Sequence, residues 1–146
     1  MYAEFFTPTP PGGYAAERTL TAGQVTTDTD ASILRQGITY HQEERYDYAL
    51  ASLRAYLESN PDPVNPNVEL LAATAAMASG EYAEAESYLQ DMPRETAKAE
   101  GAYLYYGALI NLREEQLEAA ENKLITLGKL PGAEMYPAAE ILEKMK

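Results

Sequence analysis

Residues 44–61 read ERYDYALASLRAYLESNP, and this stretch decides the fold. As a helix it has one apolar face, whose members lie three or four residues apart: Tyr46, Ala49, Leu53 and Tyr56. The small Ala49 side chain in this bulky stripe lets another helix backbone approach closely. Asn60-Pro61 ends the helix, because the residue before a proline is pushed out of the helical region. The stretch therefore predicts a helix that packs tightly against a neighbour.

Composition limits the class of protein and its partners. The 146 residues are 46% hydrophobic, which is enough for one domain with a core and argues against disorder over the whole length. The net charge of −12 repels phosphate backbones, so nucleic acid is not an expected partner. The absence of cysteine excludes disulfides, thiolate metal sites and a cysteine nucleophile.

No apolar run approaches the roughly 20 residues of a membrane-spanning helix, so direct membrane insertion of this chain is not expected. No basic and apolar leader pattern is visible at the start. The localisation stays open between a cytoplasmic protein and the soluble part of an anchored or exported one.

The chain from residue 30 onward predicts seven helices. Proline, glycine and capping residues place their ends, as in Asn65-Pro66 before the third helix and Gly80 after it. Short links make consecutive helices pack antiparallel. The expected helices span about 31–44, 46–59, 66–79, 82–91, 94–113, 115–128 and 135–146.

Residues 1–29 differ from the rest and are expected to form a non-helical, extended arm. Thr7-Pro8-Thr9-Pro10-Pro11 favours extended geometry, and residues 19–30 show no helical stripe. Tyr2, Phe5 and Phe6 are the densest aromatic cluster in the chain. The segment is either a flexible tail or an ordered arm that its aromatic rings hold on the helices.

The helix pairs recur along the chain. Ala49 and Ala85 lie 36 residues apart, and Ala85 and Ala120 lie 35 apart, each followed by leucine four residues later. The first helices carry Ile33-x2-Gln36-Gly37-x2-Tyr40 in the first copy and Tyr103-x2-Tyr106-Gly107-x2-Ile110 in the third. The third copy then has about one extra residue between its helices. The second copy is degenerate, with Glu69 at the aromatic position, Ala73 in place of glycine, and no closing proline.

Two helices per unit and a period near 34 residues resemble the tetratricopeptide repeat family over roughly residues 30–132. The resemblance implies an all-α fold, a right-handed α-solenoid of about three helix-turn-helix repeats. The expected division is an N-terminal arm at 1–29, three repeats at 30–132 and a C-terminal capping helix at 133–146. Glu140, Glu143, Lys144 and Lys146 would face solvent on that last helix, and Ala139, Leu142 and Met145 would be buried.

Catalytic chemistry finds little support in the sequence, and no enzyme activity, cofactor or metal site is expected. His41 is the only histidine, and it is interpreted as a solvated or partner-contacting residue. The acidic pairs are interpreted as solvated charge: Glu43-Glu44, Glu84/Glu86 and Glu114-Glu115.

The leading functional hypothesis is a protein-binding scaffold. The resemblance implies that the first helix of each repeat lines a concave groove, here mostly apolar, which would hold an extended or helical protein segment. The alternative is a structural, self-associating domain whose groove is filled by its own N-terminal arm. The candidate partner-binding residues lie off the predicted packing stripe of the first helices: Leu34, Arg35, Ile38, His41, Leu70, Leu71, Thr74, Met77, Leu104, Tyr105 and Asn111.

Overall fold

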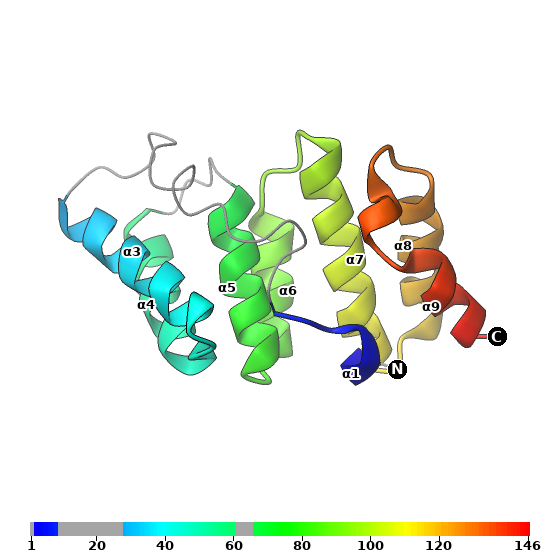
Figure 1. The fold of residues 1–146 in the computed structure, drawn as a ribbon, viewed down its shortest axis with the longest axis horizontal. Coiled ribbons are helices and arrows are strands. Elements are labelled where there is room, and N and C mark those ends of the chain that lie inside the picture. Colours follow the sequence, from blue (N-terminus) through cyan, green and yellow to red (C-terminus); the bar gives the residue numbers. More distant parts are fainter. Residues whose placement is uncertain (1, 9–27, 61–65) are drawn as a thin grey trace. The chain divides into compact units, whose positions relative to one another are not determined.

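The computed structural model describes residues 2–8, 28–60 and 66–146. In these ranges the chain forms eight α-helices and one 3-10 helix, with no strand (Figure 1). The described part is therefore all-α, as the sequence predicts. The elements are α1 (Tyr2–Phe5), α3 (Asp28–Gln42), α4 (Tyr46–Ser59), α5 (Pro66–Ala78), α6 (Tyr82–Asp91), α7 (Ala97–Arg113), α8 (Leu117–Gly128), η1 (Ala133–Met135) and α9 (Ala138–Lys144).

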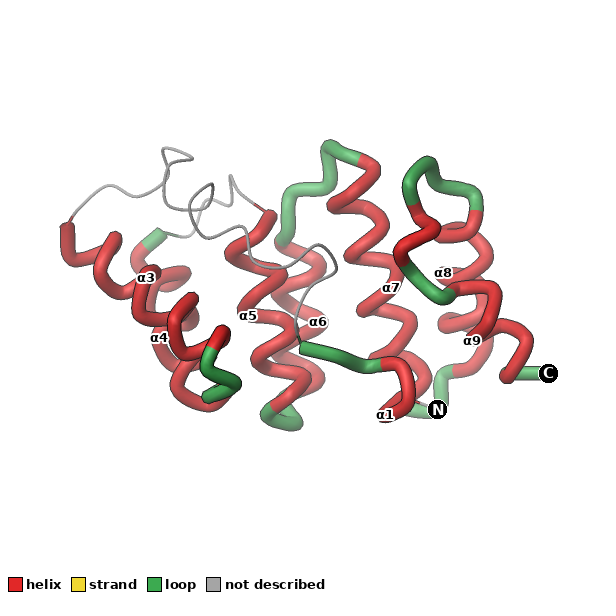
Figure 2. The backbone as a smooth tube through the Cα atoms, viewed as in Figure 1, coloured by secondary structure: helices red, strands yellow, loops and turns green. Residues whose placement is uncertain are grey.

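One compact unit spans Pro8–Pro93 and contains two helix pairs, α3 with α4 and α5 with α6. In Figure 2 each pair runs antiparallel and is closed by a short turn. α5 also packs on α3 and α4, so its side chains meet helices on more than one side. The core of this unit is built from α3, α4 and α5 around the following buried residues: Leu34, Ile38, Leu53, Tyr56, Val68, Leu71 and Ala72.

The second compact unit joins Arg94–Lys146 to the N-terminal residues Met1–Thr7. α7 pairs with α8, α9 packs on α8, and α1 packs on α7. Ile141 of α9 is fully buried, whereas Ala139 is exposed and Leu142 half-buried. The expected buried face of the last helix is therefore wrong by one residue, because Ala138 and Ile141 are buried in place of Ala139 and Leu142. α9 begins only after Pro137, which shortens it and changes which residues face α8.

The three helix pairs share one turn geometry. Glu44, Gly80 and Glu115 each adopt the left-handed conformation, with φ of 61°, 81° and 62°. The next residue in each turn donates its backbone N–H to a carbonyl five residues earlier, at 2.7–2.9 Å. This is the hydrogen bond of a Schellman-type helix end, which satisfies a carbonyl that the helix leaves free. The acceptor carbonyls belong to Tyr40, Ala76 and Asn111.

The turns also fix the register of the repeats. Ala49, Ala85 and Ala120 each lie five residues after the left-handed residue, and all three are fully buried. Seven residues before it lie Gly37, Ala73 and Ala108. The expected extra residue between the third pair of helices is therefore wrong. Ala108, rather than Gly107, is the equivalent of Gly37.

Gly37 has a packing reason to be glycine. A Cβ atom on it would lie 2.9 Å from the Leu53 side chain, which is closer than normal contact. A Cβ on Gly107 would instead meet only the flexible stem of Lys123, at 3.3 Å. Gly37 is therefore required by close packing and Gly107 is not, although their sequence contexts look alike.

The N-terminal segment departs from the expected non-helical arm. Residues Tyr2–Phe5 form a short helix, and the rings of Tyr2 and Phe6 stack with centroids 5.2 Å apart. The first proline follows at Pro8, so nothing before it prevents a helical turn. The expectations for residues 9–27 and for the connector at 61–65, including the Asn65 cap, lie outside the described residues. The expected division into arm, repeats and cap stays a prediction.

α7 begins three residues later than the sequence predicts. Thr96 is its N-cap, and the Thr96 side chain accepts a hydrogen bond from the backbone N–H of Ala99 at 3.1 Å. A threonine cap satisfies one of the free N–H groups of the first turn. The Thr96-Ala97 boundary was readable from the sequence, because threonine is a preferred N-cap residue.

Candidate protein-binding surfaces

The surface of α7 holds a segment of the same chain. The Tyr105 hydroxyl donates a hydrogen bond to the backbone carbonyl of Phe5 at 3.0 Å. Lys144 of α9 pairs with the carboxylate of Glu4 and lies over the Phe5 ring, 5.4 Å from its centroid. Main-chain, charged and aromatic contacts thus converge on α1, within the unit that contains α7 and α9.

A cluster of three tyrosines lies at this surface. The Tyr105 ring contacts two others, edge-on to Tyr106 with centroids 5.2 Å apart and tilted against Tyr136 with centroids 4.7 Å apart. Burial raises the pKa of Tyr105 to about 12 and that of Tyr136 to about 12, so both hydroxyls stay protonated near neutral pH. Tyr105 is therefore a permanent hydrogen-bond donor.

Most of the predicted partner-binding residues are interior. Each first helix packs against its own partner helix, and α5 packs on three helices of its unit, so the residues off the predicted stripe are also covered. Arg35 is exposed and Leu70 half-buried. Nine predicted residues are buried in the structure: Leu34, Ile38, His41, Leu71, Thr74, Met77, Leu104, Tyr105 and Asn111. Their role in binding a partner stays a prediction.

His41 is a buried structural residue, and its interpretation as a solvated one is wrong. Its Nε2 lies 2.9 Å from the Thr74 hydroxyl, which can also donate to backbone carbonyls of α5. Which of the two groups donates depends on the tautomer of the imidazole. Burial lowers the pKa of His41 to about 4, so the ring is neutral at pH 7. The bond ties α3 to α5.

Asn111 likewise makes internal contacts. Its amide donates to Gln116 Oε1 at 2.6 Å, and its carbonyl oxygen accepts from Lys123 Nζ at 2.6 Å. Both polar ends of the side chain are satisfied across the α7–α8 turn.

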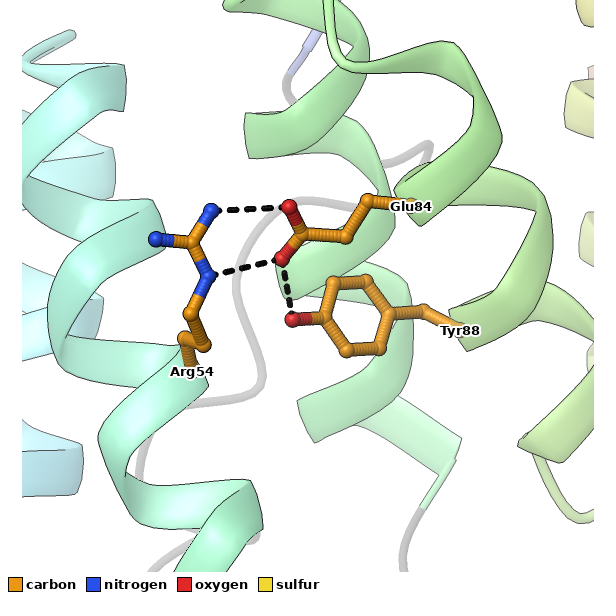
Figure 3. Close-up of polar contacts among 3 residues, drawn as sticks. All are labelled: Arg54, Glu84 and Tyr88. Atoms are coloured by element: carbon orange, nitrogen blue, oxygen red, sulfur yellow. Dashed lines mark hydrogen bonds and ion pairs between the residues drawn. The ribbon is translucent and has the colours of Figure 1, made fainter.

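A polar cleft between α4 and α6 was not predicted as a site. Arg54 of α4 donates to both carboxylate oxygens of Glu84 on α6, at 2.9 and 2.7 Å, and Tyr88 donates to the same carboxylate at 2.5 Å (Figure 3). The hydrogen bonds from Arg54 hold the pKa of Glu84 below its usual range. Glu84 is thus an ion-pair partner, and its interpretation as free solvated charge is wrong.

The cleft encloses about 410 Å³, and Glu69 of α5 contributes to its lining. The other lining residues are Arg54, Leu57, Glu58, Glu84, Tyr88 and Asp91. One signal in the sequence pointed here, because Glu69 occupies the position where the repeat calls for a large apolar residue. Arg54 and Glu84 are 30 residues apart and left no local pattern.

The family model of the tetratricopeptide repeat matches residues 40–105. This part of the chain is similar to the tetratricopeptide repeat. The match covers α4, α5 and α6 entirely, together with the end of α3 and the start of α7. Neither a curated protein nor a solved structure matches the chain.

The tetratricopeptide repeat generally mediates protein–protein interaction, and it is typically a scaffold without catalysis. In the described ranges, no histidine, cysteine, aspartate and glutamate side chains gather in a group suited to a metal ion. None of the described helices has the length and apolar character needed to cross a membrane.

Proposed function

We propose that this protein is a protein-binding module and that the surface of α7 takes a short aromatic helical or extended segment. The observation that supports it most is α1, a segment of protein chain seated on that surface. Its contacts are those of peptide recognition: a carbonyl on Tyr105, a carboxylate on Lys144, and an aromatic ring beneath the same ammonium group.

In this proposal α1 is an intramolecular occupant of the binding surface. A partner segment of similar chemistry competes with it, and because α1 is part of the chain, its local concentration is high. Partner binding then requires displacement of α1. The same contacts favour a partner with large aromatic residues and an acidic group near the α9 end.

Deletion of residues 1–8 tests the proposal. A fluorescent peptide of the sequence of residues 1–8 is expected to bind the shortened chain and to bind the full chain much more weakly. In the shortened chain, Tyr105→Phe removes the hydroxyl that donates to the peptide carbonyl. The affinity for the peptide is expected to fall several-fold. Tyr103→Phe is the matched control, because Tyr103 lies on the same helix and contacts Arg94 instead.

Absence of peptide binding, together with unchanged hydrogen exchange in α7 after deletion, would contradict the proposal. α1 would then pack on α7 without marking a surface that binds peptides.

A second candidate function is self-association through the C-terminal face. Leu117 and Ile125 of α8 are 57% and 41% exposed, beside a hollow of about 620 Å³ that includes Leu142 and Met145. Apolar residues gathered in this way favour contact with another protein surface. Sedimentation of the native chain and of Ile125→Glu tests it, and a concentration-dependent dimer that the substitution abolishes is the supporting result.

A further inference from the structure

One carboxyl oxygen in the Pro8–Pro93 unit is buried without a hydrogen-bond partner. Glu69 of α5 is 3% exposed, and its Oε2 atom has no hydrogen-bond partner. By the register of the turns, the equivalent residues in the first and third repeats are Ile33 and Leu104, both apolar. A buried polar atom without a partner is costly, so its presence in place of an apolar residue needs an explanation.

The charges around Glu69 indicate which kind of group would pair with it. Among the described residues that line the cleft, Arg54 is the only cation, and its guanidinium is bound to both oxygens of Glu84. Two further carboxylates, Glu58 and Asp91, line the same space and are exposed to solvent. The described lining residues therefore carry more negative than positive charge, and Arg54 is already paired with Glu84.

The residues that line the cleft favour a ligand with a long aliphatic stem. Arg54, Glu84 and Tyr88 form a hydrogen-bonded set that holds α4 and α6 on either side of the opening (Figure 3). Leu57 adds an apolar wall. A volume of about 410 Å³ accommodates the end of a long side chain, with its aliphatic stem on Leu57.

We propose that this cleft binds a cationic side chain, arginine or lysine, of a partner protein, with Glu69 accepting its N–H at the buried end. Such a pair satisfies the unpartnered oxygen and neutralises part of the acidic lining. The net charge of −12 attracts basic partners over longer distances. The site uses α4, α5 and α6 only, so it stands or falls separately from the proposed peptide surface on α7.

Binding at this site should depend on pH. Burial, with a smaller contribution from Asp91, raises the pKa of Glu69 to about 7. A cation binds the ionised form, so binding below pH 7 must release a proton, and affinity rises with pH until Glu69 is ionised. The other groups that face the cleft are Arg54 and Glu58 from α4, and Glu84, Tyr88 and Asp91 from α6. Of these, Arg54 and Glu84 stay charged and Tyr88 stays neutral between pH 6 and 8.

The test uses the full chain and two small peptides, acetyl-Gly-Arg-Gly-amide and its citrulline counterpart. Citrulline has almost the same shape as arginine but no charge. The carbon NMR signal of the Glu69 carboxyl reports on both binding and titration. The arginine peptide is expected to lower the titration midpoint of Glu69 by about one unit or more at saturation. Its affinity should fall as pH is lowered below 7, and the number of tenfold steps in the total fall should equal the number of pH units by which saturation lowers the midpoint.

Two variants make the test specific. Glu69→Gln keeps the shape, removes the charge, and should weaken the arginine peptide by about tenfold or more, in line with loss of a charge-assisted hydrogen bond. Glu86→Gln is the matched control, because it removes the same charge from an exposed position on α6 outside the cleft. Thermal unfolding of both variants shows that each is folded.

Equal binding of the arginine and citrulline peptides would overturn the proposal. So would equal effects of Glu69→Gln and Glu86→Gln, or a Glu69 midpoint that neither peptide moves. In each case Glu69 would be an interior acid that no cation reaches.

Discussion

The two helix pairs of the Pro8–Pro93 unit share a backbone plan and differ in chemistry. α3–α4 and α5–α6 have the same left-handed turn, the same buried alanine and the same buried leucine four residues later. Among the equivalent positions of the first helices, one changes from apolar to acidic: α3 has Ile33 where α5 has Glu69. The comparison teaches that the turn and the small residues determine the repeat, while other positions can change without altering the helices.

The leucines of the second helices test the equivalence most strongly. Leu53 and Leu89 are 0% and 1% exposed. Each change to alanine should lower the free energy of unfolding by about 2–5 kcal/mol, because it removes buried methyl groups and leaves a cavity. Urea unfolding followed by circular dichroism measures this. Leu117→Ala, at a position 57% exposed, is the control and should have little effect.

If only one of the two leucine variants were strongly destabilised, the second helices would not be equivalent. The repeat would then be present in the sequence without an equivalent packing of the second helices.

The buried alanines test how closely the helices approach. Ala49→Leu and Ala85→Leu should each cost about 1–3 kcal/mol of unfolding free energy, because no space is left for a larger side chain. Thermal unfolding measures the loss. Ala83→Leu on the exposed side of α6 is the control. Glu84 is unsuitable as a control, because it pairs with Arg54. Losses no larger than that of Ala83→Leu would mean that the alanines are not contact points.

Substitutions in the turns should have the smallest effects on stability, and they should change it in opposite directions. Glu44 adopts a left-handed conformation that costs a side-chain-bearing residue about 1 kcal/mol, so Glu44→Gly should stabilise the protein by up to that amount. Gly80→Ala should destabilise it by a similar amount, although a Cβ there meets no other atom within 4 Å. Thermal shift assays on both variants measure the signs. Two shifts in the same direction would contradict the shared turn geometry.

Much of the fold was predictable because its signals are local. α4 and α6 have the predicted bounds, since proline, glycine and the apolar stripe all mark their ends. Gly80 ends α5 through the left-handed conformation that glycine adopts easily. The start of α7 was missed because acidic and basic residues after Pro93 resemble a first helical turn, and the Thr96 cap outweighs them.

The candidate site was less predictable because its contacts are not local. His41 and Thr74 are 33 positions apart and Arg54 and Glu84 are 30 apart, and no spacing rule pairs them. The exposed face of α5 was also misjudged, because α5 packs on three helices and its predicted groove residues Leu71, Thr74 and Met77 are buried. Only Glu69 left a trace, as an acid at an apolar position of the repeat.

The pH dependence of Glu69→Gln tests most directly that an acid occupies a buried position of the shared repeat. The pKa of Glu69 is about 7 in the folded chain and about 4.3 in an unfolded one, so the folded state binds the proton more tightly. Stability from this group is therefore present at low pH and is lost as pH rises toward 7. The measurement is the free energy of unfolding of both proteins at pH 5 and pH 8.

Glutamine has no charge to bury, so the variant should equal the native chain at pH 5 and exceed it at pH 8. Between pH 5 and pH 8, a pKa difference of this size changes the free energy of unfolding by roughly 2–3 kcal/mol. A difference between the two proteins that is the same at both pH values would contradict the account. Glu69 would then not be a buried carboxyl, and the middle repeat would not carry the cleft described for it.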